Sequence, residues 1–211
     1  MRAVLVSGGT PPTKDLLLSY LKEDDFLIGV DKGCNCLYDY DLKPNLILGD
    51  FDSANTEVIK SFKEAGIEVL KFNPEKDYTD SDLGYIKAKE HGVDEILFFG
   101  ATGSRIDHSL GNIGILLKSL REGIKLEIID DNNRIFLIDK ETTIKGTYGD
   151  IISFHALSDE VKNICIKDAK YELSGYDMKL LEPRAICNEF IHKDIRISFD
   201  SGIIMVIFPK D

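Results

Sequence analysis

The chain has 211 residues, of which 43% are hydrophobic and 30% are charged, a composition typical of a soluble globular protein with one large or two small domains. Its 26 Lys and Arg residues against 37 Asp and Glu residues give a net charge of −11, and the basic residues are scattered along the chain. This balance argues against a protein that binds nucleic acid or an anionic membrane. A phosphorylated ligand would need local donors or a divalent cation to offset the repulsion.

The chain is predicted to be cytoplasmic. Residues 1–9 run directly into a short apolar strand without the pattern of a signal peptide, and no window approaches the roughly 20 apolar residues of a membrane span. Its cysteines, Cys34, Cys36, Cys165 and Cys187, are predicted to be reduced thiols. A structural zinc site is not expected, because Cys34 and Cys36 lack the two-residue spacer and a second ligand pair.

The first 130 residues alternate strand-like and helix-like segments. Short apolar runs predict strands at Ala3–Ser7, Phe26–Val30, Leu46–Leu48, Ile67–Phe72, Glu95–Phe99 and Lys125–Ile129. Helical spacing predicts helices at Thr13–Lys22, Cys34–Tyr40, Thr56–Ala65, Ser81–His91 and Asp107–Glu122, with Ser53, Asn55 and Asp80 as candidate caps. This rhythm predicts an α/β domain over residues 1–130, with an open, mostly parallel sheet and helices on both faces.

Residues 131–211 contain only strand-like segments. These are Arg134–Ile138, Thr142–Lys145, Asp150–Ala156, Lys162–Ile166, Ala169–Leu173, Arg184–Ile191, Ile195–Phe199 and Ile203–Phe208. The run Asp200-Ser201-Gly202 predicts a hairpin turn between the last two. The second domain is therefore predicted to be an antiparallel β-sandwich or barrel.

Acidic residues follow several of the predicted strands. Asp31 follows the second strand, Asp50 and Asp52 follow the third, and Asp80 comes after the fourth. Each alone could be a helix cap or a turn residue. If the three strands are neighbours, however, the four carboxylates converge on the edge where open parallel sheets bind ligands, and their repulsion favours a divalent cation. Carboxylates combined with substrate phosphates are typical of Mg²⁺.

The segment Gly100–Arg105 lies between a predicted strand and a long helix. Backbone N–H groups and a guanidinium beside a helix N-terminus suit a phosphate group, although the segment matches neither a Walker loop nor a dinucleotide-binding fingerprint. Together with the acidic edge, it predicts a polyphosphate substrate bound through Mg²⁺ and phosphoryl or pyrophosphoryl transfer.

Several other polar and aromatic residues each have two possible roles. His108 beside Asp107 is either a general base or a structural hydrogen-bonding residue, and Asn112 either faces the ligand or satisfies internal polar groups. Three aromatic residues of the second domain are either core residues or a wall that stacks on an organic ring: Tyr171, Phe190 and Phe199.

These motifs resemble the thiamine pyrophosphokinase family, whose members transfer the β,γ-pyrophosphoryl group of ATP to the hydroxyethyl oxygen of thiamine. The resemblance covers essentially the whole chain and includes the family's α/β domain followed by a β-sandwich. Its blocks are Gly8-Gly9, Asp31-Lys32-Gly33 with Asn35, Gly49–Ser53, Asp77–Leu83, Gly100–His108 with Leu110–Asn112, and Cys187–Glu189.

The resemblance implies a role for each block. Asp50, Asp52 and Asp80 would bind Mg²⁺. Because an alcohol is a poor nucleophile at neutral pH, Asp52 or Asp80 would in addition either accept the proton of the thiamine alcohol or orient it. The ATP-binding residues would be Asp31, Lys32, Gly103, Ser104, Arg105 and Asn112. Thiamine would contact Asp107, Cys187 and Asn188, in a homodimer whose active site lies at the subunit interface, and AMP would leave.

The chain departs from the family pattern at three positions of these blocks. Lys32 and Ser104 stand where Gly is common, and Cys187 stands where Ser is usual, which replaces a hydroxyl by a weaker hydrogen-bonding thiol. There is also no Trp to stack on a ligand. Lys32 could add a phosphate contact, and thiamine selectivity is the property that Cys187 would alter.

Two other functions compete with this reading. Asp50-Phe51-Asp52 imitates the motif of haloacid-dehalogenase phosphatases, but that motif normally ends the first strand and has Thr or Val where this chain has Ala54. The other is a sensor that binds ATP or thiamine diphosphate without turnover. The product decides between them, because only the pyrophosphokinase releases AMP when thiamine is present.

Overall fold

The computed structural model describes residues 1–75 and 77–210, and they form two compact units divided between Asp131 and Asn132. No helix in the described part of the chain is long and apolar enough to cross a membrane.

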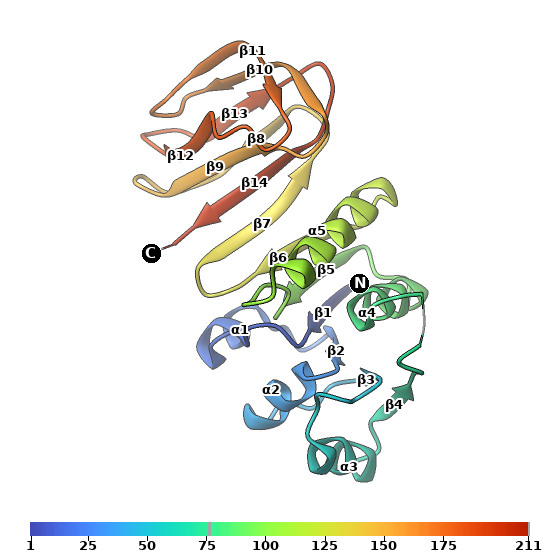
Figure 1. Cartoon of the computed structure of the whole chain (residues 1–211). Coiled ribbons are helices and arrows are strands. Elements are labelled where there is room, and N and C mark those ends of the chain that lie inside the picture. The colour runs from blue at the N-terminus through green and yellow to red at the C-terminus, as the bar shows by residue number, and fades with distance from the viewer. Residues whose placement is uncertain (76, 211) are drawn as a thin grey trace. The chain divides into compact units, whose positions relative to one another are not determined.

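The first unit alternates strands and helices (Figure 1). Its strands are β1 (Arg2–Val6), β2 (Phe26–Val30), β3 (Leu46–Gly49), β4 (Glu68–Lys71), β5 (Glu95–Phe99) and β6 (Lys125–Ile129). Its helices are α1 (Lys14–Tyr20), α2 (Gly33–Asp39), α3 (Thr56–Glu64), α4 (Asp80–Glu90) and α5 (Ile106–Arg121). Within this unit the strands lie in the order β6-β5-β1-β2-β3-β4, and each strand is parallel to its neighbours. The predicted parallel sheet is confirmed.

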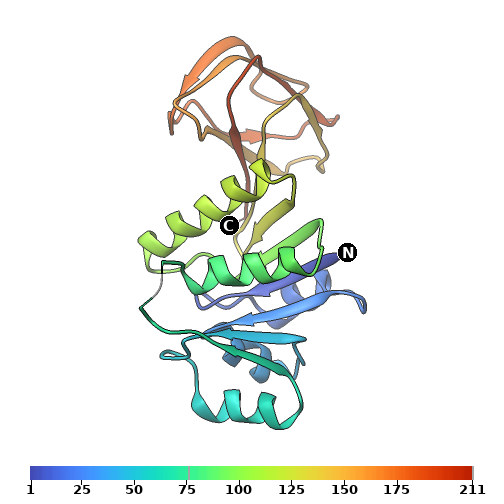
Figure 2. The same ribbon diagram turned by 90° about the vertical axis from the view of Figure 1, so that its right-hand side faces the viewer.

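Helices cover both faces of this sheet, as predicted. Side chains of α1, α2 and α3 share a buried cluster with Val4 and Val6 of β1. On the opposite face, α4 lies so close that a Cβ at Gly84 would come within 2.9 Å of Val30 and 3.1 Å of Leu5. Helix α5 contacts α4 (Figure 2). Because both faces are covered, alternate residues of the central strands are buried on either side.

The helix caps differ in part from the prediction. Asn55 caps α3, since its side chain accepts a hydrogen bond from the N–H of Glu57. At α4 the cap is Thr79, which accepts from the N–H of Asp82, so Asp80 is the first helical residue and not the cap. Ser53 is not a cap either, because its hydroxyl donates to Asp31.

The second unit is a sandwich of two antiparallel sheets. One sheet has the order β12-β9-β14-β7 within this unit and the other β11-β10-β13-β8. Apolar side chains from both sheets fill one core. The strands are β7 (Asn133–Ile138), β8 (Thr142–Ile144), β9 (Ile151–Ala156), β10 (Glu160–Lys167), β11 (Leu173–Lys179), β12 (Ala185–Glu189), β13 (Ile195–Ser198) and β14 (Ile204–Pro209). The predicted antiparallel domain is therefore confirmed as a sandwich.

Two local predictions for this unit are wrong. Asp200-Ser201-Gly202 does not form a hairpin between the last two strands, because β13 and β14 belong to different sheets and the turn carries the chain from one to the other. The strand predicted at Ala169–Leu173 begins instead at Leu173. Ala169 forms only an isolated bridge to Phe190, whereas β11, an edge strand rich in polar residues, lacks the apolar run that marks the other strands.

Candidate active site

A cavity of about 700 Å³ lies at the carboxyl ends of the parallel strands in the first unit. Its walls come from the segments that follow β1, β2, β3, β4 and β5, from the first turn of α4 and from the first two turns of α5. The lining residues are Ser7–Pro11, Asp31, Lys32, Asp50, Ser53, Pro74, Tyr78–Ser81, Gly100–Arg105, His108, Ser109 and Asn112. The cavity lies where open parallel sheets bind their ligands.

The cavity floor is made largely of main chain. Beyond the strand ends, the N–H of Gly9 donates to the carbonyl of Gly100 (2.9 Å) and the N–H of Thr10 donates to that of Thr102 (2.8 Å). A Cβ at Gly9 would lie 2.2 Å from the Thr102 oxygen, and one at Gly100, whose φ is +61°, would lie 2.3 Å from the oxygen of Ser7. These positions therefore require glycine.

Gly33, the first residue of α2, must also be glycine for steric reasons, although it does not line the cavity. A Cβ there would lie 2.0 Å from the backbone oxygen of Val6, so only glycine lets the start of α2 approach β1. This close approach explains the glycine of the Asp31-Lys32-Gly33 block.

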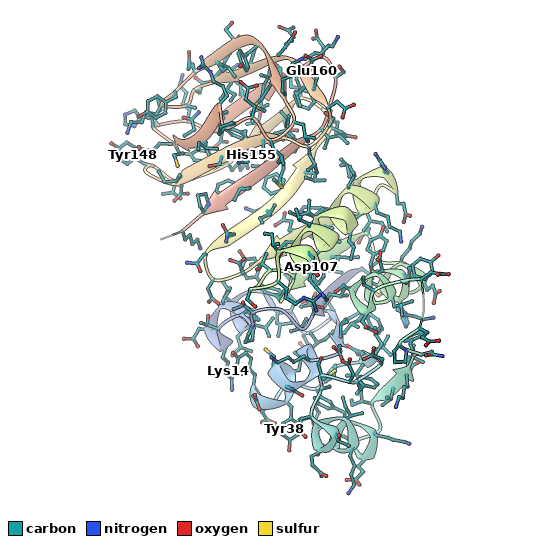
Figure 3. All side chains as sticks on the ribbon, viewed as in Figure 1. Lys14, Tyr38, Asp107, Tyr148, His155 and Glu160 are labelled. Atoms are coloured by element: carbon teal, nitrogen blue, oxygen red, sulfur yellow. The ribbon has the colours of Figure 1, made fainter. Side chains whose placement is uncertain are left out.

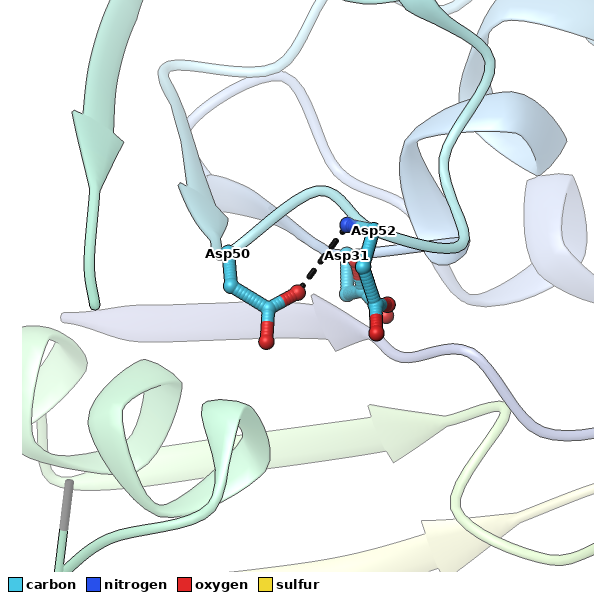
Figure 4. Close-up of side chains that lie close together, drawn as sticks. All are labelled: Asp31, Asp50 and Asp52. Carbon is cyan, nitrogen blue, oxygen red and sulfur yellow. Dashed lines mark hydrogen bonds between the residues drawn. The ribbon is translucent and has the colours of Figure 1, made fainter. Parts of the chain in front are cut away.

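Three carboxylates meet beside this floor. Asp31, Asp50 and Asp52 each place an oxygen within 4.8 Å of the others (Figure 4). The backbone reaches this arrangement through left-handed conformations at Asp31 (φ 48°) and Phe51 (φ 59°), the second of which is rare for a bulky residue. The Phe51 side chain packs against the core beneath α1, α2 and α3, which holds the turn in place.

The electrostatics of the three carboxylates favour a cation. Burial raises the pKa of Asp31, a hydrogen bond from Ser53 opposes this, and the charges of Asp80 and Asp50 raise it further, so that the net pKa is above the usual value. Its Oδ1 atom is buried and has no hydrogen-bond partner among the described residues. Hard carboxylate oxygens at this spacing fit Mg²⁺.

Asp80 lies at the edge of the same cavity, at the start of α4. The residues predicted to bind the metal are Asp50, Asp52 and Asp80, whereas the group of three within 4.8 Å contains Asp31 in place of Asp80. Asp80 acts on this group through its charge, which raises the pKa of Asp31.

Two serines that sequence analysis did not single out hold Asp80 in place. The hydroxyl groups of Ser7, after β1, and Ser81, in the first turn of α4, lie 2.8 Å apart and are buried. This hydrogen bond fixes the start of α4 against the end of β1. The signals available from sequence are the position of Ser7 at the end of a predicted strand and the position of Ser81 within the Asp77–Leu83 block.

The loop Gly103–Arg105 forms another wall, and α5 begins directly after it. The Arg105 guanidinium binds the Asp107 carboxylate through two hydrogen bonds, which lowers the pKa of Asp107 to about 2. Figure 3 labels Asp107 on this helix. Asn112 is buried and its amide donates to the carbonyl of Ala101 (2.7 Å), which is the internal contact that the sequence allowed for.

The residues predicted to contact thiamine from the second unit lie on β12. Cys187 is exposed, has φ 54° and donates its N–H to the hydroxyl of Ser153. Asn188 is only 2% exposed, and its side chain binds both the N–H and the carbonyl of Tyr171 and accepts from Glu189. In this structure the Asn188 amide therefore orients the adjoining loop.

The other aromatic residues and cysteines considered in the sequence analysis differ in how far they are buried. Phe190 is a core residue and Phe199 packs against the same core, whereas residue Tyr171 is 61% exposed. The cysteines are free thiols, as predicted, and burial raises the pKa of Cys36 to about 11.

Comparisons with known proteins agree with this arrangement. Residues 17–128 match the family model described as thiamin pyrophosphokinase, catalytic domain, and residues 136–204 match the model described as thiamin pyrophosphokinase, vitamin B1 binding domain. Thiamine pyrophosphokinase from Bacillus subtilis (strain 168) is 34% identical over 98% of both chains.

Solved structures give the same result. A crystal structure of thiamine pyrophosphokinase from Bacillus subtilis has a TM-score of 0.90 at 34% identity, covering 100% of each chain. One of thiamin pyrophosphokinase from Geobacillus thermodenitrificans has a TM-score of 0.87 at 31% identity, covering 100% of this chain and 98% of the other. The resemblance seen in the sequence motifs is thus confirmed, and the chain belongs to the thiamin pyrophosphokinase family.

Proposed function

We propose that this chain transfers the β,γ-pyrophosphoryl group of ATP to thiamine, giving thiamine diphosphate and AMP. The observation that carries the proposal is the group of Asp31, Asp50 and Asp52 beside a cavity floored by main chain, in a chain of this family. The thiamine hydroxyl oxygen forms a bond to the β-phosphorus, the bond from that phosphorus to the bridging oxygen of the α-phosphate breaks, and AMP leaves.

Mg²⁺ is the cation that these residues fit. Asp50 and Asp52 would hold it, with Asp31 and Asp80 completing the acidic surroundings. Bound there, Mg²⁺ would neutralise the charge of the triphosphate and of the departing AMP. Asp52 or Asp80 accepts the proton that the thiamine hydroxyl loses.

Positively charged and amide groups on the cavity walls position the triphosphate. Lys32 and Arg105 are cations that line the cavity, and the Gly103-Ser104 turn lies close to the main-chain floor. Asn112 supports this wall by binding the carbonyl of Ala101. Holding the reacting groups in line supplies much of the rate in pyrophosphoryl transfer.

The test is AMP formation from ATP and Mg²⁺, with and without thiamine, on the wild-type chain and on Asp52→Asn. We expect thiamine-dependent AMP that disappears with EDTA and collapses in the variant. A folded protein that releases inorganic phosphate without thiamine would be a phosphohydrolase, and one that binds ligands without turnover would be a sensor. Either result would refute the proposed reaction.

We further propose that the second domain, which was predicted at residues 131–211 and corresponds to the second unit from Asn132 onward, binds thiamine and forms a homodimer whose active site lies between subunits. The match of residues 136–204 to a vitamin B1 binding model supports this role, and the exposed Cys187 offers a contact for the ligand. Asp107 would contact the aminopyrimidine ring, and Asn188 would shape the pocket through the loop it orients.

Complementation tests the shared site. Asp52→Asn and Cys187→Arg, each inactive alone, are mixed and allowed to exchange subunits. If each site uses Asp52 from one chain and Cys187 from the other, mixed dimers contain one intact site, and random exchange restores about a quarter of wild-type activity. No recovery, with exchange verified by mass, would place both residues of a site in one chain.

A further inference from the structure

The guanidinium of Arg105, which lines the cavity, is bound to a carboxylate two residues further along the chain. Nε of Arg105 donates to Oδ1 of Asp107 (3.2 Å) and Nη2 donates to Oδ2 (2.7 Å). The two side chains are 69% and 64% exposed, so both can be reached by ligands. Arg105 lines the cavity, whereas Asp107 is not among the lining residues and lies beside it in the first turn of α5.

A phosphate chain competes directly for this guanidinium. The described lining residues supply the carboxylates Asp31, Asp50 and Asp80 but only Lys32 and Arg105 as permanent cations. A phosphate group accepts the same two-pronged hydrogen bonding from Arg as a carboxylate does, and a triphosphate carries more charge than Asp107. A bound triphosphate would therefore compete with Asp107 for Arg105.

We propose that the nucleotide's phosphates take Arg105 from Asp107 and that the released carboxylate then binds the second substrate, so that nucleotide and thiamine bind cooperatively. The proposal rests on the proposed function, which supplies the two ligands. Thiamine carries a cationic thiazolium ring and an amino group, and both are attracted to a free carboxylate more than to one neutralised by a guanidinium.

The size of the cooperativity follows from the exposure of the pair. An exposed ion pair changes an equilibrium by at most about fivefold. By linkage, thiamine must tighten nucleotide binding by the same factor as nucleotide tightens thiamine binding. The hydrogen bonds from Arg105 lower the pKa of Asp107, and an Asp without such a partner has a pKa of about 3.9, so Asp107 is charged at neutral pH in both states and its release needs no change of protonation.

Calorimetry on the full chain with Mg²⁺ tests the proposal. Thiamine is titrated with and without α,β-methylene-ATP, whose α–β bridge is not cleaved, at a concentration shown to saturate each variant. In the wild type, we expect the nucleotide analogue to tighten thiamine binding about fivefold. In Arg105→Gln, thiamine should bind about fivefold more tightly than to the wild type when nucleotide is absent, and the analogue should add nothing.

Two further variants separate release of Asp107 from a change in net charge. Arg105→Lys keeps the charge but loses the two-pronged geometry, so thiamine affinity without nucleotide should lie between those of the wild type and Arg105→Gln. Lys87→Gln removes a cation from the Lys87–Glu90 ion pair of α4 and should leave both thiamine affinities unchanged.

The outcomes distinguish this proposal from the proposed function. Equal thiamine affinity with and without the analogue in the wild type overturns the cooperativity alone. Arg105→Gln could instead bind thiamine more tightly than the wild type by the same factor with and without the analogue. That result would assign the effect to the change in net charge and would also overturn the cooperativity. If thiamine fails to bind in every state while the analogue binds normally, the proposed function fails, and the cooperativity fails with it.

Discussion

Replacing Asp31 by Asn should stabilise the metal-free protein and weaken its binding of Mg²⁺. Asn keeps the shape of the side chain, can still accept the hydrogen bond from Ser53, and tolerates the left-handed φ of 48° as Asp does. The substitution therefore removes one negative charge from the group formed with Asp50 and Asp52 and changes little else.

The expected size follows from the spacing of the carboxylates. Two unit charges 4.8 Å apart repel by about 3.5 kcal/mol at an effective dielectric constant of about 20. Because Asp52 is exposed, water screens this repulsion, and we expect a gain of about 1–2 kcal/mol in the free energy of unfolding. For a chain of this length, the melting temperature rises by about 2–8 °C.

Urea unfolding followed by circular dichroism, in EDTA and in saturating MgCl₂, measures both effects. Mg²⁺ stabilises the folded state according to its affinity, so it should stabilise the wild type more than the variant. Asp41→Asn is a matched control, because Asp41 is exposed, has φ 58° and lies outside the group of three carboxylates.

The reasoning would be wrong if Asp31→Asn were no more stable than the wild type in EDTA while Asp41→Asn remained unchanged. That result would mean that the three carboxylates do not repel each other appreciably, and the electrostatic argument for a cation would be lost.

Three further predictions concern the fold and the cavity wall. Gly33→Ala should lower the free energy of unfolding by about 3 kcal/mol, because its Cβ would lie 2.0 Å from a backbone oxygen of β1. Gly114→Ala, in open space on α5, should raise it by about 0.5–1 kcal/mol. Equal effects of the two substitutions in urea unfolding would contradict the steric argument. Burial pushes the pKa of Asp25 upward, but hydrogen bonds from Arg2 and the backbone hold it below its usual value. The stabilisation by ionised Asp25 is present above the pKa of about 3.9 that Asp25 has in the unfolded chain, and it disappears as pH falls through the lower pKa of the folded state. When the free energy of unfolding is measured at decreasing pH, the wild type should therefore lose stability that Asp25→Asn does not lose. Lys32→Gln should raise the KM for ATP about fivefold and leave that for thiamine unchanged, as measured by AMP formation, and an unchanged KM for ATP would remove Lys32 from the phosphate site.

Hydrophobic patterning was sufficient to predict the fold class of both units. Strands β1, β2 and β3 of the first unit are buried on both faces, so each appears as a continuous apolar run. Asp31 and Asp50, which follow β2 and β3, line the cavity at the ligand-binding edge. The second unit was harder because local patterns do not show which sheet a strand joins. The turn at Asp200–Gly202 was therefore predicted to close a hairpin, and the polar edge strand β11 was predicted several residues too early in the chain.

The detailed geometry of the site depends on features that leave no sequence signal. Positive φ values at Asp31 and Phe51 determine which carboxylates meet, and the residue type alone does not predict a positive φ at either position. Likewise, Arg105 and Asp107 are two residues apart, and only their side-chain rotamers reveal that they bind each other.

The cavity has two parts that respond differently to substitution. Its main-chain floor cannot be reshaped by changing side chains, whereas its walls can. A side chain at Gly9 or Gly100 would overlap a backbone oxygen, so variants that fold retain the same floor. Lys32 and Ser104, by contrast, are exposed wall residues, and replacing them costs the fold little. Affinity and selectivity for phosphate ligands can therefore evolve at the walls while the geometry of the reaction is inherited intact.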